Sequence, residues 1–550
     1  MAKKDENKLS YLQMPLPESG KHYKMTKRSW SGLNYKQTID TGALSMENNI
    51  STLESPYLVP SQKRISFADI YLHPISMFGF DDFLLIIYRN SSSIKIDYIT
   101  VDEYGNVDNV YTGTLQSSGA SSDDEYPRCV VQFNVYDTPT DPVSGEYIKK
   151  LLIFPDKKSM DFEITEDNFE INNMSVLVKE YYNKTKEDDG TYPPPTTASH
   201  NYYYKNTYNE DVYKWVDDTS DSDNSGWRVS IPPAMPDIKY AAVHLSRLFG
   251  VDDDRVYASG YNDYTNWNLD TVDEYNESNA WCSPAQSNTK AGGVFTGITN
   301  FQGHIVCFKR DFMHEIYNTK NPFRIQDIYA EGAIDHRTIQ DVDGRLIFVS
   351  EDNVKIYTGS NPRIIGYYLN MKQYVNAVSG TDGRCYYLYC EDADNYKRLF
   401  VYDTIVEQWS EQNIDSRVLS FAHNKNGMYM LCGNGVIYKM DTDNYRHSWS
   451  FETDLITNET VNIKHIKKIQ MFADIASGAN IKVYVLYDDE EFDEDTSHLV
   501  YSSAGYGQKP IRIKPRNTAS YGIKLHIQGY GYVKLYELEL FMENGGDLYA

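Results

Sequence analysis

The sequence lacks the features of a membrane-spanning or disulfide-rich protein. It contains no run of about 18 apolar residues, so we expect no helix that spans a membrane. No apolar stretch follows the first residues, so we expect no signal peptide and predict synthesis in a cytoplasm. The cysteines show no C-x-x-C spacing, which favours reduced core thiols over a metal site or disulfides. There are six: Cys129, Cys282, Cys307, Cys385, Cys390 and Cys432.

Sequence motifs for common enzyme chemistry are also missing. No G-x-S-x-G, H-E-x-x-H or Walker pattern occurs, and the Asp-box repeats of sialidases are absent. The aspartate run at 252–254 lacks the alternating ligands and final Glu of a calcium loop, so a turn is favoured there. The acidic segment 488–495 is interpreted as a solvated turn, with a calcium or partner site as the alternative. The sequence therefore predicts no catalytic residues, no metal site and no cofactor.

Basic residues are few, with 53 Lys and Arg against 78 Asp and Glu, for a formal net charge of −25. Affinity for nucleic acid comes mainly from basic side chains that displace counterions, so a conventional nucleic-acid binder is disfavoured. Attraction to an anionic membrane is disfavoured for the same reason. A strongly acidic channel, in contrast, would let a polyanion slide through without sticking.

The sequence does contain a repeat between residues 294 and 451. A glycine in a polar turn precedes a run of strand-forming residues, and a second such run follows. The glycines Gly303, Gly344, Gly383 and Gly427 are 41, 39 and 44 residues apart. A period of about 40 residues with four strands per unit is typical of a β-propeller blade, whose sheet gains burial only by packing on neighbouring blades. An ordinary β-sandwich with regular hairpins is the alternative.

The rest of the chain divides around this repeat. We predict an extended arm over 1–63, whose first 36 residues are basic and which docks on the protein from Trp30 onward. An all-β propeller of about six to eight blades, with seven candidates, follows over 64–452. It carries a polar insertion rich in Tyr, Asp and Pro at 165–236. Alternating apolar residues over 453–550 predict an antiparallel β-sandwich.

Two groups of sequence motifs resemble those of a known protein family. The first is W-S-G-L-N-Y at 30–35 with T-I-D-T-G-A-L-S-M-E-N-N-I-S at 38–51. The second is H-x-S-R-L-F-G at 244–250, D-R-V-Y-A-S at 254–259 and N-D-Y-T-N-W at 262–267. These blocks, scattered over residues 28–300, resemble phage proteins of the packaged-DNA stabilisation or tail-nozzle family. The resemblance implies a propeller subunit of a hexameric ring below the portal and adaptor, without catalytic residues.

The resulting expectation is a structural virion protein made in the host cytoplasm. A homo-hexameric ring in the phage tail would retain the packaged DNA and then conduct it during ejection, without sequence specificity. The 48 tyrosines suit such an assembly, because subunit interfaces are enriched in tyrosine. Two alternatives stay open, namely a receptor- or carbohydrate-binding tail protein and a propeller-type glycan hydrolase. Which residues form an interface or face a lumen is unknown from the sequence.

Overall fold

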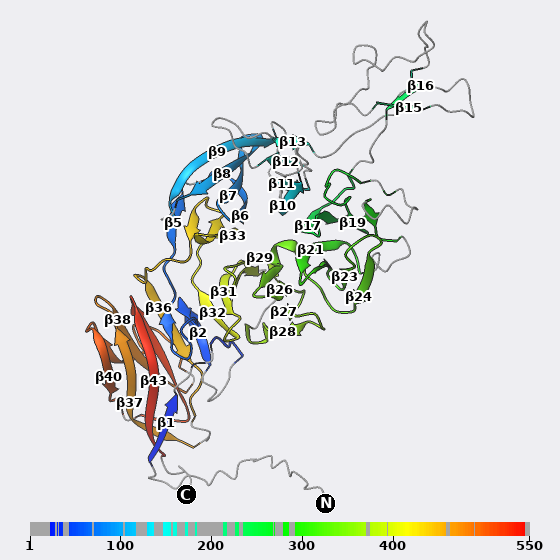
Figure 1. The fold of residues 1–550 in the computed structure, drawn as a ribbon. Coiled ribbons are helices and arrows are strands. Elements are labelled where there is room, and N and C mark those ends of the chain that lie inside the picture. Colours follow the sequence, from blue (N-terminus) through cyan, green and yellow to red (C-terminus); the bar gives the residue numbers. More distant parts are fainter. Residues whose placement is uncertain are drawn as a thin grey trace, which may run out of the picture.

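The fold is all-β and contains a propeller and a sandwich (Figure 1). The computed structural model describes residues 22–27, 30, 32–36, 43–68, 71–102, 105–116, 129–136, 147–155, 158–161, 171–173, 182–183, 213–216, 226–229, 235–267, 269, 279–284, 292–369, 374–392, 394–457, 462–488, 490–516 and 518–544.

Within these residues, seven antiparallel sheets of four strands each form the propeller. The first two sheets are β6 (Pro74–Phe80), β7 (Phe83–Asn90), β8 (Ser93–Val101) and β9 (Val107–Gln116), then β10 (Cys129–Tyr136), β11 (Tyr147–Phe154), β12 (Lys158–Asp161) and β13 (Ile171–Asn173). The third and fourth are β17 (Tyr240–His244), β18 (Arg247–Val251), β19 (Val256–Ala258) and β20 (Trp281–Cys282), then β21 (Phe295–Phe301), β22 (His304–Lys309), β23 (Met313–Tyr317) and β24 (Arg324–Ile328). The fifth and sixth are β25 (Gln340–Val342), β26 (Arg345–Val349), β27 (Val354–Tyr357) and β28 (Arg363–Ile364), then β29 (Tyr374–Thr381), β30 (Cys385–Asp392), β31 (Lys397–Asp403) and β32 (Gln408–Gln412). The seventh is β33 (Val418–Asn424), β34 (Gly427–Cys432), β35 (Ile437–Lys439) and β5 (Ile65–Ala68).

The ring closes through a strand exchanged between its ends. The outer strand of the seventh blade is β5, which precedes the first blade in the sequence and pairs antiparallel with β35. The first and seventh blades also share an apolar cluster, in which Met77 and Ile86 pack with Tyr429 and Leu431. The ring is therefore closed both by strand hydrogen bonds between β35 and β5 and by apolar packing between the first and seventh blades. The propeller expected from the sequence is confirmed, and the described part of the chain forms seven blades.

The repeat glycines do mark hairpins, but the turns differ from one another. All four adopt positive φ, which glycine reaches without strain. Asp343 precedes Gly344 with a φ of 53°, as the Asx-Gly signal predicts. Asp382 acts differently, because its carboxylate accepts the backbone N–H groups of Arg384 and Cys385 at 2.9 and 2.7 Å.

The sandwich consists of two five-stranded sheets, and the N-terminal arm adds a strand to each. One sheet contains β1 (His22–Lys27), β43 (Val533–Asn544), β37 (Lys464–Ile475), β40 (Gly507–Ile513) and β41 (Ala519–Ser520). The other contains β2 (Leu44–Asn48), β36 (Ser448–Thr453), β42 (Ile523–Tyr530), β38 (Asn480–Tyr487) and β39 (His498–Ser503). β36 thus lies in the sandwich, although the sequence repeat placed residues up to 452 in the propeller.

The arm runs across both domains of its own chain. Trp30 is buried in the sandwich core, where its ring lies edge-on to Phe451 at 5.8 Å. Three residues later, Leu33 packs in the apolar core between the fifth and sixth blades, and its N–H donates to the carbonyl of Trp409. A short hairpin of β3 (Ile50–Ser51) and β4 (Val59–Pro60) follows β2. The arm therefore already docks at β1, which pairs with β43, rather than only from Trp30 onward as the sequence suggested, and it contacts both domains. The basic residues before His22 lie outside the described residues.

The described part of the insertion forms a small sheet of its own. Its strands are β14 (Tyr182–Asn183), β16 (Gly226–Val229) and β15 (Tyr213–Val216), and β15 and β16 project away from the ring in Figure 1. β13 falls inside the range 165–236 but pairs with β12 as the fourth strand of the second blade. The second blade therefore continues into the segment that the sequence assigned to the insertion.

Candidate functional site

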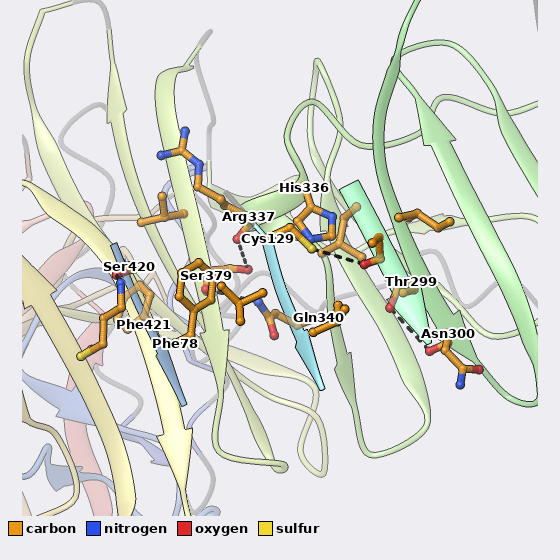
Figure 2. Close-up of a pocket in the computed structure, with 18 of the residues that line it drawn as sticks. Phe78, Cys129, Thr299, Asn300, His336, Arg337, Gln340, Ser379, Ser420 and Phe421 are labelled. Atoms are coloured by element: carbon orange, nitrogen blue, oxygen red, sulfur yellow. Dashed lines mark hydrogen bonds between the residues drawn. The ribbon is translucent and has the colours of Figure 1, made fainter. Parts of the chain in front are cut away.

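The candidate site is the channel along the propeller axis, where the first strands of the blades meet. Residues from β6, β10, β17, β21, β29 and β33, together with the short helix η3 (His336–Thr338) and β25, surround a cavity of about 390 Å³ (Figure 2). In six blades the strands follow one another in sequence order from the inner strand outward, and in the seventh only the outermost strand, β5, departs from that order. The channel of a propeller is a common place for ligands, so its side chains decide what chemistry is open to this chain.

Most polar groups along the channel are used to hold neighbouring blades together. The hydroxyl of Ser379 donates to the carbonyl of Arg337 at 3.0 Å, and the amide of Gln340 donates to the carbonyl of Ser379 at 3.3 Å. The thiol of Cys129 donates to the carbonyl of Ala241 at 3.3 Å, across the second and third blades. These contacts cross blade boundaries, and two of them can be followed as dashed lines in Figure 2.

The imidazole and the guanidinium that line the channel, those of His336 and Arg337, come from one short segment that precedes the fifth blade. Arg337 is paired with Asp335, with a distance of 2.9 Å between the guanidinium and the carboxylate. Burial alone would raise the pKa of the Asp335 carboxyl, but the hydrogen bonds and charge of Arg337 outweigh burial and lower it. His336 stacks on Tyr240 at 4.9 Å, and burial lowers the pKa of its ring to about 4. At neutral pH the segment therefore carries an ion pair and an uncharged imidazole.

The carboxylates that a glycoside hydrolase needs can be sought in the lining of this cavity. Such enzymes place two carboxyl groups about 5–9.5 Å apart on either side of the scissile bond. Among the described residues that line the cavity there is no Asp and no Glu. The described residues also contain no group of three or more His, Cys, Asp or Glu side chains that could hold a metal ion.

The motifs singled out in the sequence have structural roles. None of the six cysteines, all of which lie in described strands, forms a disulfide, and five of them are buried. Asp252 accepts the backbone N–H groups of Asp254 and Arg255 at 2.7 Å, so the aspartate run forms a turn. The guanidinium of Arg247 is buried and donates to the carbonyls of Ser259 and Asn279, at 2.6 and 2.7 Å.

The channel residues His336 and Arg337 were missed by sequence reasoning. They lie in a short connection before the fifth blade, where no periodicity marks them. Only the closed ring brings them beside Ser379 and Tyr240. In the described residues, no helix is long and apolar enough to cross a membrane.

Comparison with known proteins gives little beyond the architecture. No family model and no curated protein matches the sequence. Among solved structures, BamB from Moraxella catarrhalis is 11% identical, with a TM-score of 0.31 and coverage of 75% of this chain and 99% of that chain. The WD40 domain of Toxoplasma gondii coronin is 8% identical, with a TM-score of 0.24 and coverage of 89% and 88%. GH43B of the Bacteroides ovatus xyloglucan PUL is 9% identical, with a TM-score of 0.21 and coverage of 54% and 94%. At these identities and TM-scores, none of them bears on what this chain does.

Proposed function

We propose that this chain is a structural virion protein of a short-tailed phage. Six copies would form a ring in the tail, below the portal and adaptor, which retains the packaged DNA and then conducts it during ejection. The support for this proposal is the resemblance of the two sequence blocks to the tail-nozzle family, together with the framework roles that those blocks have in the fold.

The first block joins the two domains. It contains Trp30, buried in the sandwich, and Leu33, buried between blades, and it continues into β2. The second block builds the third blade around Arg247, whose side chain is 1% exposed. Tyr264 and Trp267 of the same block are 2% exposed and pack in the core shared by the second, third and fourth blades. Both blocks thus contribute to the rigidity of the fold. A tail subunit needs such rigidity to withstand the pressure of the packaged DNA.

We propose further that the chain is not an enzyme. The described lining of the channel offers the guanidinium of Arg337 and neutral groups, and no pair of carboxylates for acid–base catalysis. In this proposal, DNA passes through a lumen enclosed by several copies, outside the individual propellers.

The net charge fits such a lumen. Six chains of −25 each would carry a summed charge of about −150. Acidic groups that face the lumen would repel the DNA backbone and reduce sticking during passage. Retention before infection would then require a narrow gate or contact with another tail protein.

The deciding experiment is an image of the phage particle at a resolution that traces this chain. We expect six copies around the tail axis, directly below the adaptor. Native mass of the purified chain with the portal and adaptor proteins provides an independent count of copies. A monomer located at a fibre tip would favour the receptor-binding alternative, and turnover on a polysaccharide would favour the hydrolase.

A further inference from the structure

The sandwich has a groove on the outer face of the sheet formed by β2, β36, β42, β38 and β39. Its volume is about 470 Å³. Its lining is rich in neutral polar side chains and includes two aromatic residues, the buried Trp449 and the exposed Tyr530. The residues that matter are Asn48, Ser450, Asn480, Lys482, Gln528 and Tyr530.

Strand register places these side chains in two adjacent rows. Asn48 is paired with Ser450, Ser450 with Gln528, and Gln528 with Lys482, so one row crosses four strands. In the next row Tyr530 lies between Ser448 and Asn480. Directly paired side chains in a sheet lie about 5 Å apart, which allows one ligand to contact several of them.

The rows face outward because their neighbours on each strand face the core. Phe451, Ile527 and Val483 lie in a row adjacent to Ser450, Gln528 and Lys482, and all three are fully buried in the sandwich core. Side chains alternate between the two faces of a strand, so the polar rows project to the opposite side. The groove therefore lies on the polar outer face of the sheet and does not result from poor packing of the core.

The acidic loop after β38 closes one end of the groove. Phe492 stacks on the buried His526 ring at 3.5 Å and anchors the loop on the sheet. Two residues later, the carboxylate of Glu494 accepts from Lys482 at 2.8 Å and from the amide of Gln528 at 3.2 Å. The ion pair leaves the groove without net charge. The loop that the sequence suggested to be a solvated turn is thus a wall of this groove.

One acceptor in the groove has no partner. The side-chain oxygen Oδ1 of Asn48 is buried, and nothing among the described residues donates to it. Because this oxygen is shielded from solvent, contacts to a ligand would come from the accessible polar groups of the groove. The amides of Asn480 and Gln528 offer further donors and acceptors. Tyr530, which also lines the groove, is 39% exposed.

We propose that this groove binds an uncharged oligosaccharide. Sugar hydroxyls both donate and accept hydrogen bonds, which matches amide and hydroxyl side chains, and the apolar face of a sugar ring packs against a tyrosine ring. An acidic glycan fits less well, because Glu494 already neutralises Lys482. This inference does not depend on a role in DNA ejection, since the groove is complete within one chain.

The test uses the full-length chain on an array of uncharged hexose and N-acetylhexosamine oligosaccharides, with sialylated and sulfated counterparts. The strongest uncharged ligand is then titrated calorimetrically against the double variant Asn480→Ala/Gln528→Ala. We expect the affinity to fall at least about tenfold, because hydrogen bonds to the ligand are lost. The matched control is Gln508→Ala on β40, an exposed amide of the other sheet, for which we expect unchanged affinity.

A second variant separates uncharged from acidic ligands. Glu494→Gln removes the partner charge of Lys482, and we expect it to change the affinity for the uncharged ligand less than about threefold. The proposal is overturned if no uncharged oligosaccharide binds, if binding survives the double variant, or if only acidic glycans bind in a salt-sensitive way. Thermal unfolding establishes that each variant is folded. The native mass of the ring reports on the proposed tail function separately.

Discussion

The backbone N–H of Glu411 donates a hydrogen bond to the carboxylate of Glu47 at 3.2 Å, and this contact links the sixth blade to the sandwich. Glu47 is 3% exposed, and its second oxygen is buried without a partner among the described residues. Burial raises the pKa of Glu47 to about 8, although the hydrogen bond from Glu411 opposes the shift. Burial also raises the pKa of Glu411 to about 8, and its carboxylate accepts from the hydroxyl of Tyr35. The joint between the domains therefore favours protonated carboxyls.

The first prediction concerns the pH dependence of stability. A carboxyl whose pKa rises from 4.5 to about 8 on folding contributes stability that is fully present below pH 4.5 and is lost as the pH rises towards 8. Glu47→Gln removes this dependence, so we expect the variant to match the wild type near pH 5 and to exceed it by about 1–3 kcal/mol at pH 8.5. Thermal unfolding between pH 5 and 9 measures the difference. A constant offset between the two proteins across this range would contradict the assignment.

The second prediction concerns the arm. Trp30→Ala leaves a cavity in the sandwich core beside Phe451, and we expect a loss of about 3–5 kcal/mol in unfolding free energy. Leu53→Ala, in the same arm but 43% exposed, is the control and should cost less than about 0.5 kcal/mol. Denaturant unfolding monitored by fluorescence compares the two. Equal unfolding free energies of the two variants would show that packing of Trp30 does not stabilise the folded chain.

The third prediction concerns the boundary between the fourth and fifth blades. Glu315 is 2% exposed and accepts hydrogen bonds from the hydroxyls of Tyr317 and Tyr357, and it lies 3.0 Å from Nε2 of His304. Burial, reinforced by the Glu315 charge, raises the pKa of Tyr357. Tyr357→Phe removes one donor from a buried carboxylate, and we expect a loss of about 1–3 kcal/mol.

The control for this boundary is Tyr396→Phe, because Tyr396 is 66% exposed. Its melting temperature should stay within about 1 °C of the wild type, whereas Tyr357→Phe should lower it by several degrees. Calorimetry of both variants at one pH provides the comparison. A Tyr357→Phe variant as stable as the wild type would mean that the contact adds nothing to blade packing.

The fourth prediction compares two repeat glycines. Both have positive φ, 70° at Gly344 and 126° at Gly427, so alanine is strained at either position. A Cβ on Gly344 would meet nothing within 4 Å, whereas a Cβ on Gly427 would collide with the carboxylate of Asp441. We expect Gly344→Ala to cost about 1 kcal/mol and Gly427→Ala at least twice as much. Thermal unfolding of the two variants decides, and a reversed order would contradict the turn geometry.

Much of the propeller could be predicted from residues that act locally. Glycines such as Gly344 define hairpins, and apolar runs such as 345–349 define strands, because turn conformation and strand alternation depend on near neighbours in the sequence. The number of blades was harder to predict. The fourth strand of the seventh blade, β5, lies more than 350 residues from its partner β35, and no local signal links them.

The sequence by itself determined the all-β class, the repeat of about 40 residues, the acidic charge and the lack of catalytic motifs, because each depends on composition or short-range spacing. Only the tertiary structure decided where the arm goes, which side chains line the channel and which form the groove on the sandwich. Asn48, Ser450 and Gln528 come from distant parts of the chain and become neighbours only when their strands pair. Strand pairing over such separations depends on burial of the whole sheet, and no window of the sequence contains that information.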